Sequence, residues 1–306
     1  MRSAFLGTPS ASIPSLAALM DVTDVAVVVT RPDSAKGRSG RATPPPVKVA
    51  AEEWGLPVVQ PGSRAELDEI LQNAAIDVGV VVAYGRILSS AALASAPAGF
   101  VNVHFSLLPR WRGAAPVERA ILEGDESTGV TLMQLDEGLD TGPVIAAVET
   151  PIAPDETGGS LTGRLAYLGG MLIDDAMSEL LAGRLDSASQ LSTGVTMADR
   201  LDRSEGRIEA SWTVAYAERA IRAFSPRPGA WFSIDGTRCR VHRASYSDDA
   251  VTPGTIAPFN GAAVLGLEGG SLALDLLQPA GKAVMTGTAW LNGRRGAGGH
   301  IDPLPE

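Results

Sequence analysis

Short apolar runs alternate with longer periodic segments over the first 182 residues of the chain. The apolar runs predict strands, and segments in which apolar residues recur every three to four positions predict helices. The predicted strands are Ser3–Leu6, Val25–Thr30, Pro57–Val59, Val78–Ala83, Val101–His104, Gly129–Leu135 and Val144–Val148. The predicted helices are Pro14–Met20, Pro46–Trp54, Arg64–Ala74, Ala114–Glu123 and Ser160–Ala182. This alternation predicts a Rossmann-like α/β domain with a mostly parallel sheet.

The pattern changes after residue 182. Glycines and mixed polar residues over 183–206 predict a linker. One helix, Val214–Ala223, then precedes a series of short strands. These are Trp231–Ile234, Arg238–Ala244, Gly254–Ala257, Ala263–Leu267 and Leu272–Gln278. Such closely spaced strands predict a small β-barrel of the OB type. We therefore expect an α/β domain over 1–182, a linker over 183–206 and an OB-like C-terminal domain over 207–306.

Composition excludes several classes of protein. The longest apolar run, Val78–Ala83, falls far short of the ~20 residues that cross a bilayer. Glycine and prolines break up the apolar N-terminus, which predicts a strand and a turn rather than a signal peptide, so we expect a cytoplasmic protein. One cysteine and three histidines predict neither a disulfide nor a metal site. The Gly7-Thr8-Pro9 turn lacks the further glycines of a dinucleotide-binding fingerprint.

The charge of the chain is unevenly distributed. The net charge is −10, but residues 1–206 carry 15 basic and 26 acidic residues (−11), whereas residues 207–306 carry 10 basic and 9 acidic residues (+1). A cationic, glycine-containing loop stands out in the first part, with Arg31, Lys36, Arg38, Arg41 and Lys48 against a single Asp33. From composition alone, this loop is either a solvated surface segment or a contact for a polyanion.

The strand Val101–His104 carries the strongest chemical signal. Asn102 and His104 are two residues apart, so they point to one face of the strand, at the edge where open α/β sheets bind ligands. A neutral imidazole can accept a proton, and an asparagine amide can donate a hydrogen bond to a developing oxyanion. A carboxylate near the histidine would complete the site, and the turn after the next strand offers Asp136, Glu137 and Asp140. Their positions leave the choice among these acids open.

The run NVHFSLLPRWRGAAP followed by LDEGLDTG resembles the folate-dependent formyltransferases. The resemblance implies that Asn102, His104 and Asp140 are the catalytic residues and that residues 1–182 form the catalytic domain. It also places the loop residues Ser106, Leu107, Leu108 and Pro109 against the tetrahydrofolate carrier.

Within these enzymes the chain most resembles those that formylate methionyl-tRNA. Further similar segments are FLGTPSASIPSL, the cationic loop, AIRAFSPRPGAW and LQPAGKAVMTG. The resemblance implies transfer of the formyl group of 10-formyltetrahydrofolate to the α-amino group of methionyl initiator tRNA. Arg38 and Arg41 are the implied tRNA contacts, together with Arg200, which stands where the family commonly has a lysine. We expect a monomer without a bound metal.

Two other functions remain open. A formyltransferase acting on a small amine would use the same catalytic residues, and the cationic loop and the second domain argue against it. A non-catalytic RNA-binding protein built on the barrel is the second alternative, and the charge of +1 in that region argues against strong binding by the barrel alone.

Overall fold

The computed structural model describes residues 1–35, 42–181 and 186–303, and the chain forms two compact units. Unit 1 comprises Met1–Pro116, Ser127–Pro151 and Thr162–Ala198. Unit 2 comprises Val117–Glu126, Ile152–Leu161 and Asp199–Glu306. Two short segments, Val117–Glu126 and Ile152–Leu161, thus belong to unit 2 although the residues on either side of them belong to unit 1. The domain and linker boundaries expected from the sequence stay a prediction.

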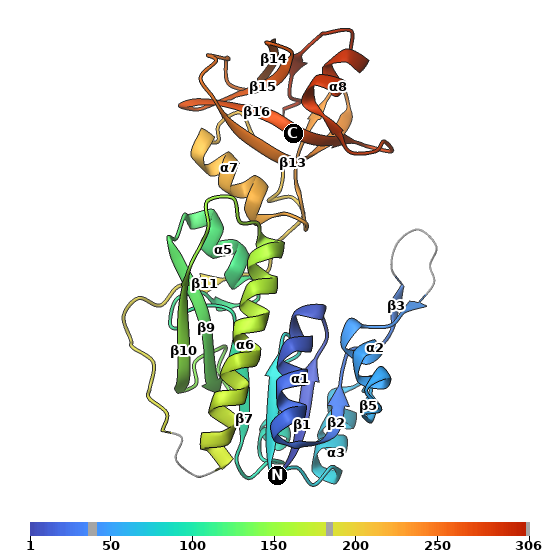
Figure 1. Cartoon of the computed structure of the whole chain (residues 1–306), viewed down its shortest axis with the longest axis vertical. Coiled ribbons are helices and arrows are strands. Elements are labelled where there is room, and N and C mark those ends of the chain that lie inside the picture. Colours follow the sequence, from blue (N-terminus) through green and yellow to red (C-terminus); the bar gives the residue numbers. More distant parts are fainter. Residues whose placement is uncertain (36–41, 182–185, 304–306) are drawn as a thin grey trace. The chain divides into compact units, whose positions relative to one another are not determined.

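The core of unit 1 is a seven-stranded sheet in the order β10-β9-β7-β6-β1-β2-β5 (Figure 1). The five strands from β7 to β5 are parallel. Strand β9 runs antiparallel to β7, and β10 runs antiparallel to β9, which confirms the mostly parallel sheet. The strands are β1 (Arg2–Gly7), β2 (Asp24–Val29), β5 (Val58–Val59), β6 (Val78–Val82), β7 (Phe100–His104), β9 (Ser127–Gln134) and β10 (Val144–Pro151). Two short pairs lie outside it, β3 (Ser34–Ala35) with β4 (Ala42–Thr43), and β8 (Arg112–Gly113) with β11 (Met197–Ala198).

Helices cover both faces of this sheet. The first face carries η1 (Ser10–Ser12), α1 (Ile13–Val22), α2 (Pro46–Glu53) and α6 (Gly158–Leu181), and the second carries α3 (Arg64–Asn73) and α4 (Ser90–Leu93) (Figure 1). On the second face Leu67 of α3 packs in one buried cluster with Leu6 of β1. On the first face, a Cβ at Gly169 of α6 would lie 2.7 Å from the Val103 side chain. Val103 therefore faces α6, and its neighbours in β7 face the other way.

Gly79 in β6 makes room for an aromatic ring in the core. A Cβ at this position would lie 2.0 Å from a ring carbon of Phe100 on the neighbouring strand. Phe100 itself is 2% exposed. The glycine that interrupts the most apolar run of the sequence therefore allows β6 and β7 to pack with a buried ring between them.

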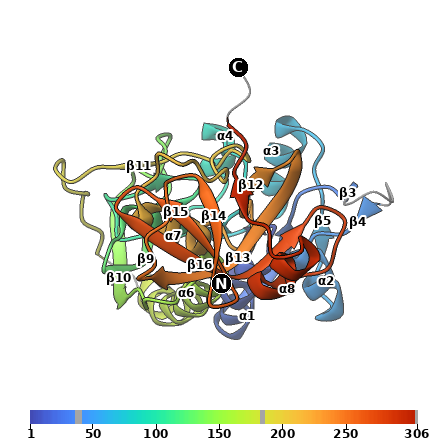
Figure 2. The same cartoon turned by 90° about the horizontal axis from the view of Figure 1, so that it is seen from above.

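The C-terminal part of unit 2 is a nearly closed antiparallel barrel in the order β12-β13-β16-β15-β14-β18, as expected for the OB-like domain. Its strands are β12 (Ala230–Ile234), β13 (Thr237–Ser247), β14 (Thr255–Phe259), β15 (Ala262–Leu267), β16 (Gly270–Pro279), β17 (Met285–Thr286) and β18 (Gly299–His300). The helices of unit 2 include α5 (Pro116–Glu123), α7 (Val214–Ala223) and α8 (Gly287–Gly293). Figure 2 shows α7 and α8 against this sheet. Among the described residues, no helix is long and apolar enough to cross a membrane.

Candidate active site

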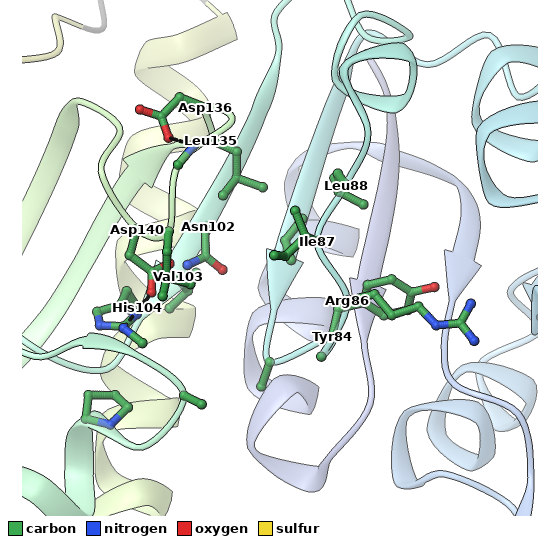
Figure 3. Close-up of a pocket in the computed structure, with 18 of the residues that line it drawn as sticks. Tyr84, Arg86, Ile87, Leu88, Asn102, Val103, His104, Leu135, Asp136 and Asp140 are labelled. Atoms are coloured by element: carbon green, nitrogen blue, oxygen red, sulfur yellow. Dashed lines mark hydrogen bonds and ion pairs between the residues drawn. The ribbon is translucent and has the colours of Figure 1, made fainter. Parts of the chain in front are cut away.

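A cavity of about 480 Å³ opens at the carboxyl ends of β6 and β7 in unit 1 (Figure 3). Its wall is formed mainly by β7, the loop after β6 and the loop after β9, with further residues from α4 and from β8 and the turn that follows it. The lining residues include Val81, Tyr84, Arg86, Ile87, Leu88, Leu93, Asn102, His104, Phe105, Gly113, Leu135 and Asp140. The fold thus brings Asn102, His104 and Asp140 together at one cavity, at the sheet edge where the sequence predicts a ligand.

A backbone carbonyl fixes the tautomer of His104. The imidazole is buried, and its Nε2 lies 2.8 Å from the carbonyl oxygen of Trp111. Because a carbonyl oxygen can only accept, Nε2 carries the proton of the neutral ring and donates it to Trp111. Nδ1 therefore keeps its lone pair and lies 3.7 Å from Oδ2 of Asp140. The basic nitrogen is thus the one that faces the acid.

Trp111 presents this carbonyl from a left-handed backbone conformation with φ 63°. Such a conformation costs a non-glycine residue roughly 1–2 kcal/mol. The Trp111 N–H donates to Oγ1 of Thr196 at 2.9 Å, and the Trp111 ring is buried beneath the guanidinium of Arg110, which lies 4.3 Å from the ring centroid. The strained residue is therefore held on both its backbone and its side chain.

Of the three acids in the loop after β9, Asp140 is the one that approaches His104. Its backbone is also left-handed, with φ 53°, and Oδ2 accepts a 2.8 Å hydrogen bond from the Gly113 N–H. Asp136 instead accepts hydrogen bonds from Thr141 within its own loop, and Glu137 accepts one from Ser90.

Asn102 lies next to His104 with its side chain unpartnered. Its backbone pairs with Val81 of β6 and Met133 of β9, which fixes the direction of the side chain. The residue is 9% exposed, and its amide has no hydrogen bond to the described part of the chain. Figure 3 shows this amide between Asp140 and the open side of the cavity. A buried amide that faces a cavity without a partner is available to a ligand.

Burial controls the protonation of His104. Desolvation lowers its pKa below the ordinary value of 6.5, while the Asp140 carboxylate and the Trp111 carbonyl oppose this effect and raise it. The net effect is a lowered pKa. The ring is therefore neutral at neutral pH and can take up a proton, with Asp140 placed to stabilise the charge that results.

The loop expected to contact folate does not line the cavity. None of Ser106, Leu107, Leu108 and Pro109 is among the lining residues. The Ser106 hydroxyl donates to the Arg110 carbonyl at 2.6 Å, and the Leu108 N–H donates to Thr131 of β9, so the loop is held by its own contacts. The neighbouring Phe105 does line the cavity.

The loop after β6 is a part of the site that was not predicted from the sequence. Residues 83–88 form the wall opposite Asn102 and His104, with the apolar side chains of Ile87 and Leu88 (Figure 3). Arg86 donates to the Pro61 carbonyl at 3.0 Å. This loop follows a parallel strand next to β7, so the rule that ligands bind at the carboxyl edge was a signal that could have found it.

The predicted tRNA contacts are only partly described. Arg38 and Arg41 lie outside the described residues, and Arg200 is exposed in unit 2.

A second group of basic residues, not predicted from the sequence, lies in unit 2. It surrounds Trp231 and consists of Arg203, Arg207, Arg238 and Arg240, which we call the Trp231 arginine cluster. Arg238 lies over the indole ring at 4.0 Å and Arg207 at 5.5 Å. Burial and the neighbouring Arg240 and Arg203 lower the pKa of Arg238, which is the effect of like charges held close together. None of the four forms a salt bridge with a carboxylate of the described residues, although the charge of Arg203 helps to lower the pKa of the neighbouring Asp202. The cluster is thus a local positive site on a chain of net negative charge.

No group of three or more His, Cys, Asp or Glu side chains that could hold a metal ion occurs within residues 1–35, 42–181 and 186–303.

Comparison with known proteins finds relatives over nearly the whole chain. The family model for formyl transferase matches residues 1–177, and the model for the formyl transferase C-terminal domain matches residues 200–295. The methionyl-tRNA formyltransferase of Myxococcus xanthus is 44% identical over 97% of this chain and 96% of its own length. That of Halorhodospira halophila is 46% identical over 96% of both chains.

Solved structures share the fold. The N-formyltransferase from Helicobacter canadensis, solved with folinic acid and dTDP-3-aminofucose, superposes with a TM-score of 0.68 at 18% identity, over 89% of this chain and 98% of that one. At this identity the likeness concerns the fold alone. The two family models and the close relatives together show that the chain is a formyltransferase and belongs to the methionyl-tRNA formyltransferase family.

Proposed function

We propose that this enzyme transfers the formyl group of 10-formyltetrahydrofolate to the α-amino group of methionyl initiator tRNA, and that Asn102, His104 and Asp140 carry the chemistry. The observation that supports these roles best is the state of His104. Its Nε2 proton is held by the Trp111 carbonyl, so the lone pair on Nδ1 is available beside Asp140 and at the wall of the cavity.

In the proposed reaction the amine attacks the formyl carbon directly, without a nucleophile from the protein. His104 accepts at Nδ1 the proton that the amine loses. The Asn102 amide donates a hydrogen bond to the formyl oxygen, which becomes negatively charged as the new C–N bond forms. The bond from the formyl carbon to the carrier nitrogen then breaks, and His104 returns the proton to that nitrogen. Asp140 stabilises the imidazolium between the two proton transfers.

The cavity suits the carrier end of the formyl donor. Its volume of about 480 Å³ lies within the usual range of small-molecule sites, and its walls combine apolar side chains with a few polar groups. We propose that the loop over residues 83–88 holds the folate ring system and leaves the formyl group beside Asn102. Ser106, Leu107, Leu108 and Pro109 support this site through hydrogen bonds within their own loop and to β9 rather than by lining it.

The acceptor is inferred from the relatives and from charge. The Trp231 arginine cluster offers guanidinium groups to phosphates, and Arg38, Arg41 and Arg200 stay proposed contacts. A cytoplasmic monomer also stays our expectation.

A transfer assay with three acceptors tests the proposal. Methionyl initiator tRNA, free methionine and a dTDP-amino sugar are each offered with 10-formyltetrahydrofolate, and the formylated product is measured. We expect product with the charged tRNA alone. Turnover of the amino sugar at the rate of the tRNA would contradict the proposed acceptor. The variant His104→Gln should lose turnover with every acceptor, and retained turnover would contradict the role of the base.

A further inference from the structure

Gln190 connects the two loops that complete the active site. It lies in the segment 186–198, which the sequence pattern marks as part of a linker and which the structure places in unit 1. Its Nε2 lies 2.9 Å from the Asp140 carbonyl oxygen and 2.8 Å from that of Gly142. Its Oε1 lies 2.6 Å from Nη2 and 3.0 Å from Nε of Arg112. One side chain thus joins the loop after β9 to the loop after β7.

The partners of this amide determine its orientation. The guanidinium of Arg112 can only donate, so it requires the oxygen of the amide. The carbonyls of Asp140 and Gly142 can only accept, so they require the NH₂ group. Both requirements are met at once, and no other side chain of this length both accepts from a guanidinium and donates to two carbonyls. Glutamate has no proton to donate at neutral pH, and methionine can replace neither function.

The rest of the segment fixes the opposite side of the site. The Thr196 carbonyl accepts from the Arg112 N–H at 2.9 Å, and the Ala198 carbonyl accepts from Ala114 at 2.8 Å. Gly113, whose N–H donates to the Asp140 carboxylate, lies so close to the Ala198 carbonyl that a Cβ there would be 2.6 Å from that oxygen. The N–H that holds the Asp140 side chain is therefore itself positioned by this segment.

Asp140 depends on such contacts more than His104 does. His104 stands in a strand that is paired on both sides, whereas Asp140 stands in a loop with a left-handed backbone. The 3.7 Å distance between Oδ2 of Asp140 and Nδ1 of His104 therefore depends on the position of the Asp140 backbone, which belongs to no strand or helix. The amide of Gln190 bonds directly to the carbonyl of that residue.

We propose that Gln190 is a positioning residue of the transfer reaction: it holds the Asp140 loop so that the carboxylate stays beside Nδ1 of His104. The inference rests on the proposed function, because it gives the Gln190 contacts a purpose only if Asp140 assists His104. Loss of the amide should let the loop move without removing any group that lines the cavity, since Gln190 is not among the lining residues.

The test compares Gln190→Met, which keeps the length but neither hydrogen-bonding function, with Gln190→Glu, which can accept from Arg112 but not donate to the carbonyls. Gln72→Met on the exposed side of α3 is the matched control. We expect both Gln190 variants to lower kcat by about 10-fold to 10²-fold, the cost of a small misplacement, with KM for both substrates nearly unchanged. The histidine titration should also respond, because a displaced carboxylate stabilises the imidazolium less and His104 then titrates at lower pH.

A purely structural role would lower thermal stability and leave the kinetics and the His104 titration of the folded enzyme as they are. That result, or a wild-type kcat in Gln190→Glu, would overturn the inference. Asp140→Asn is measured alongside. Loss of turnover in Asp140→Asn but not in Gln190→Met refutes the positioning role alone, whereas full turnover in Asp140→Asn refutes the proposed role of the acid and this inference with it.

Discussion

Replacing Asp140 by asparagine isolates the electrostatic effect of the acid on His104. Asparagine keeps an oxygen for the Gly113 N–H but carries no charge. The proton on Nε2 stays in place, because the Trp111 carbonyl and not Asp140 holds it. The substitution therefore leaves the tautomer intact and removes the charge that opposes the effect of burial on the pKa of His104.

The distance between the two groups sets the size of the effect. Nδ1 and Oδ2 are 3.7 Å apart, and both side chains are largely buried. Two unit charges about 4 Å apart interact by about 4 kcal/mol at an effective dielectric constant of 20. We expect the pKa of His104 to fall in Asp140→Asn, because the charge that stabilises the imidazolium against burial is lost.

Proton and carbon NMR of the histidine rings measures this directly. The chain has only three histidines, so the His104 signal is assigned by its loss in His104→Gln, and the signals of His242 and His300 serve as internal references. Turnover should fall by about 10²-fold to 10⁴-fold, the usual contribution of a positioned acid or base. A His104 titration that stays unchanged or moves to higher pH in Asp140→Asn would refute this account of the site.

Three further outcomes are expected. Asn102→Ala should lower kcat by about 10²-fold to 10³-fold with little change in KM, because it removes a hydrogen bond made to the oxyanion; a comparable rise in KM would show ground-state binding instead. Arg238→Ala should raise KM for tRNA but not for folate. It should also reduce the slope of log affinity for tRNA against log salt concentration by about one, as expected for the loss of one phosphate contact, whereas the control Arg295→Ala should change neither quantity. Gly79→Ala should lower the free energy of unfolding by about 1–3 kcal/mol in denaturant titrations, because the new methyl group overlaps Phe100. If the denaturation midpoint and the denaturant dependence of Gly79→Ala equal those of the wild type, β6 and β7 adjust to the methyl group without a cost in stability.

Half of the site follows from local sequence rules. The side chains of a strand alternate between its faces, so the spacing of Asn102 and His104 is enough to place them together, and Val103 on the face toward α6 agrees with the same rule. The identity of the acid beside His104 does not follow from such a rule. Asp136, Glu137 and Asp140 lie within five residues of one another, and the left-handed backbone at Asp140 that turns it toward His104 has no signature in the sequence.

The elements that the pattern did not predict share a physical reason. Helix α8 begins and ends with glycine, which weakens its helical signal, yet Trp290 and Leu291 bury it in the core of unit 2. The Trp231 arginine cluster combines residues from a turn and two strands, so it exists only in the folded barrel. Tertiary packing decides both features, and local propensity does not report on it.

The division between strand and loop explains why a segment predicted to be a linker contacts the proposed active site. The sheet positions Asn102 and His104 through paired backbones, which needs no help from distant parts of the chain. Asp140 and the Trp111 carbonyl stand in loops with left-handed backbones, and both loops bond to residues 190–198. Gln190 and Thr196 lie between the two segments that the family models match, which end at residue 177 and resume at residue 200. A chain that ends after α6 would keep His104 and Asn102, the proposed base and oxyanion donor, but would lose the contacts that hold the Asp140 loop and Trp111. The active site that we propose therefore includes the contacts of residues 190–198.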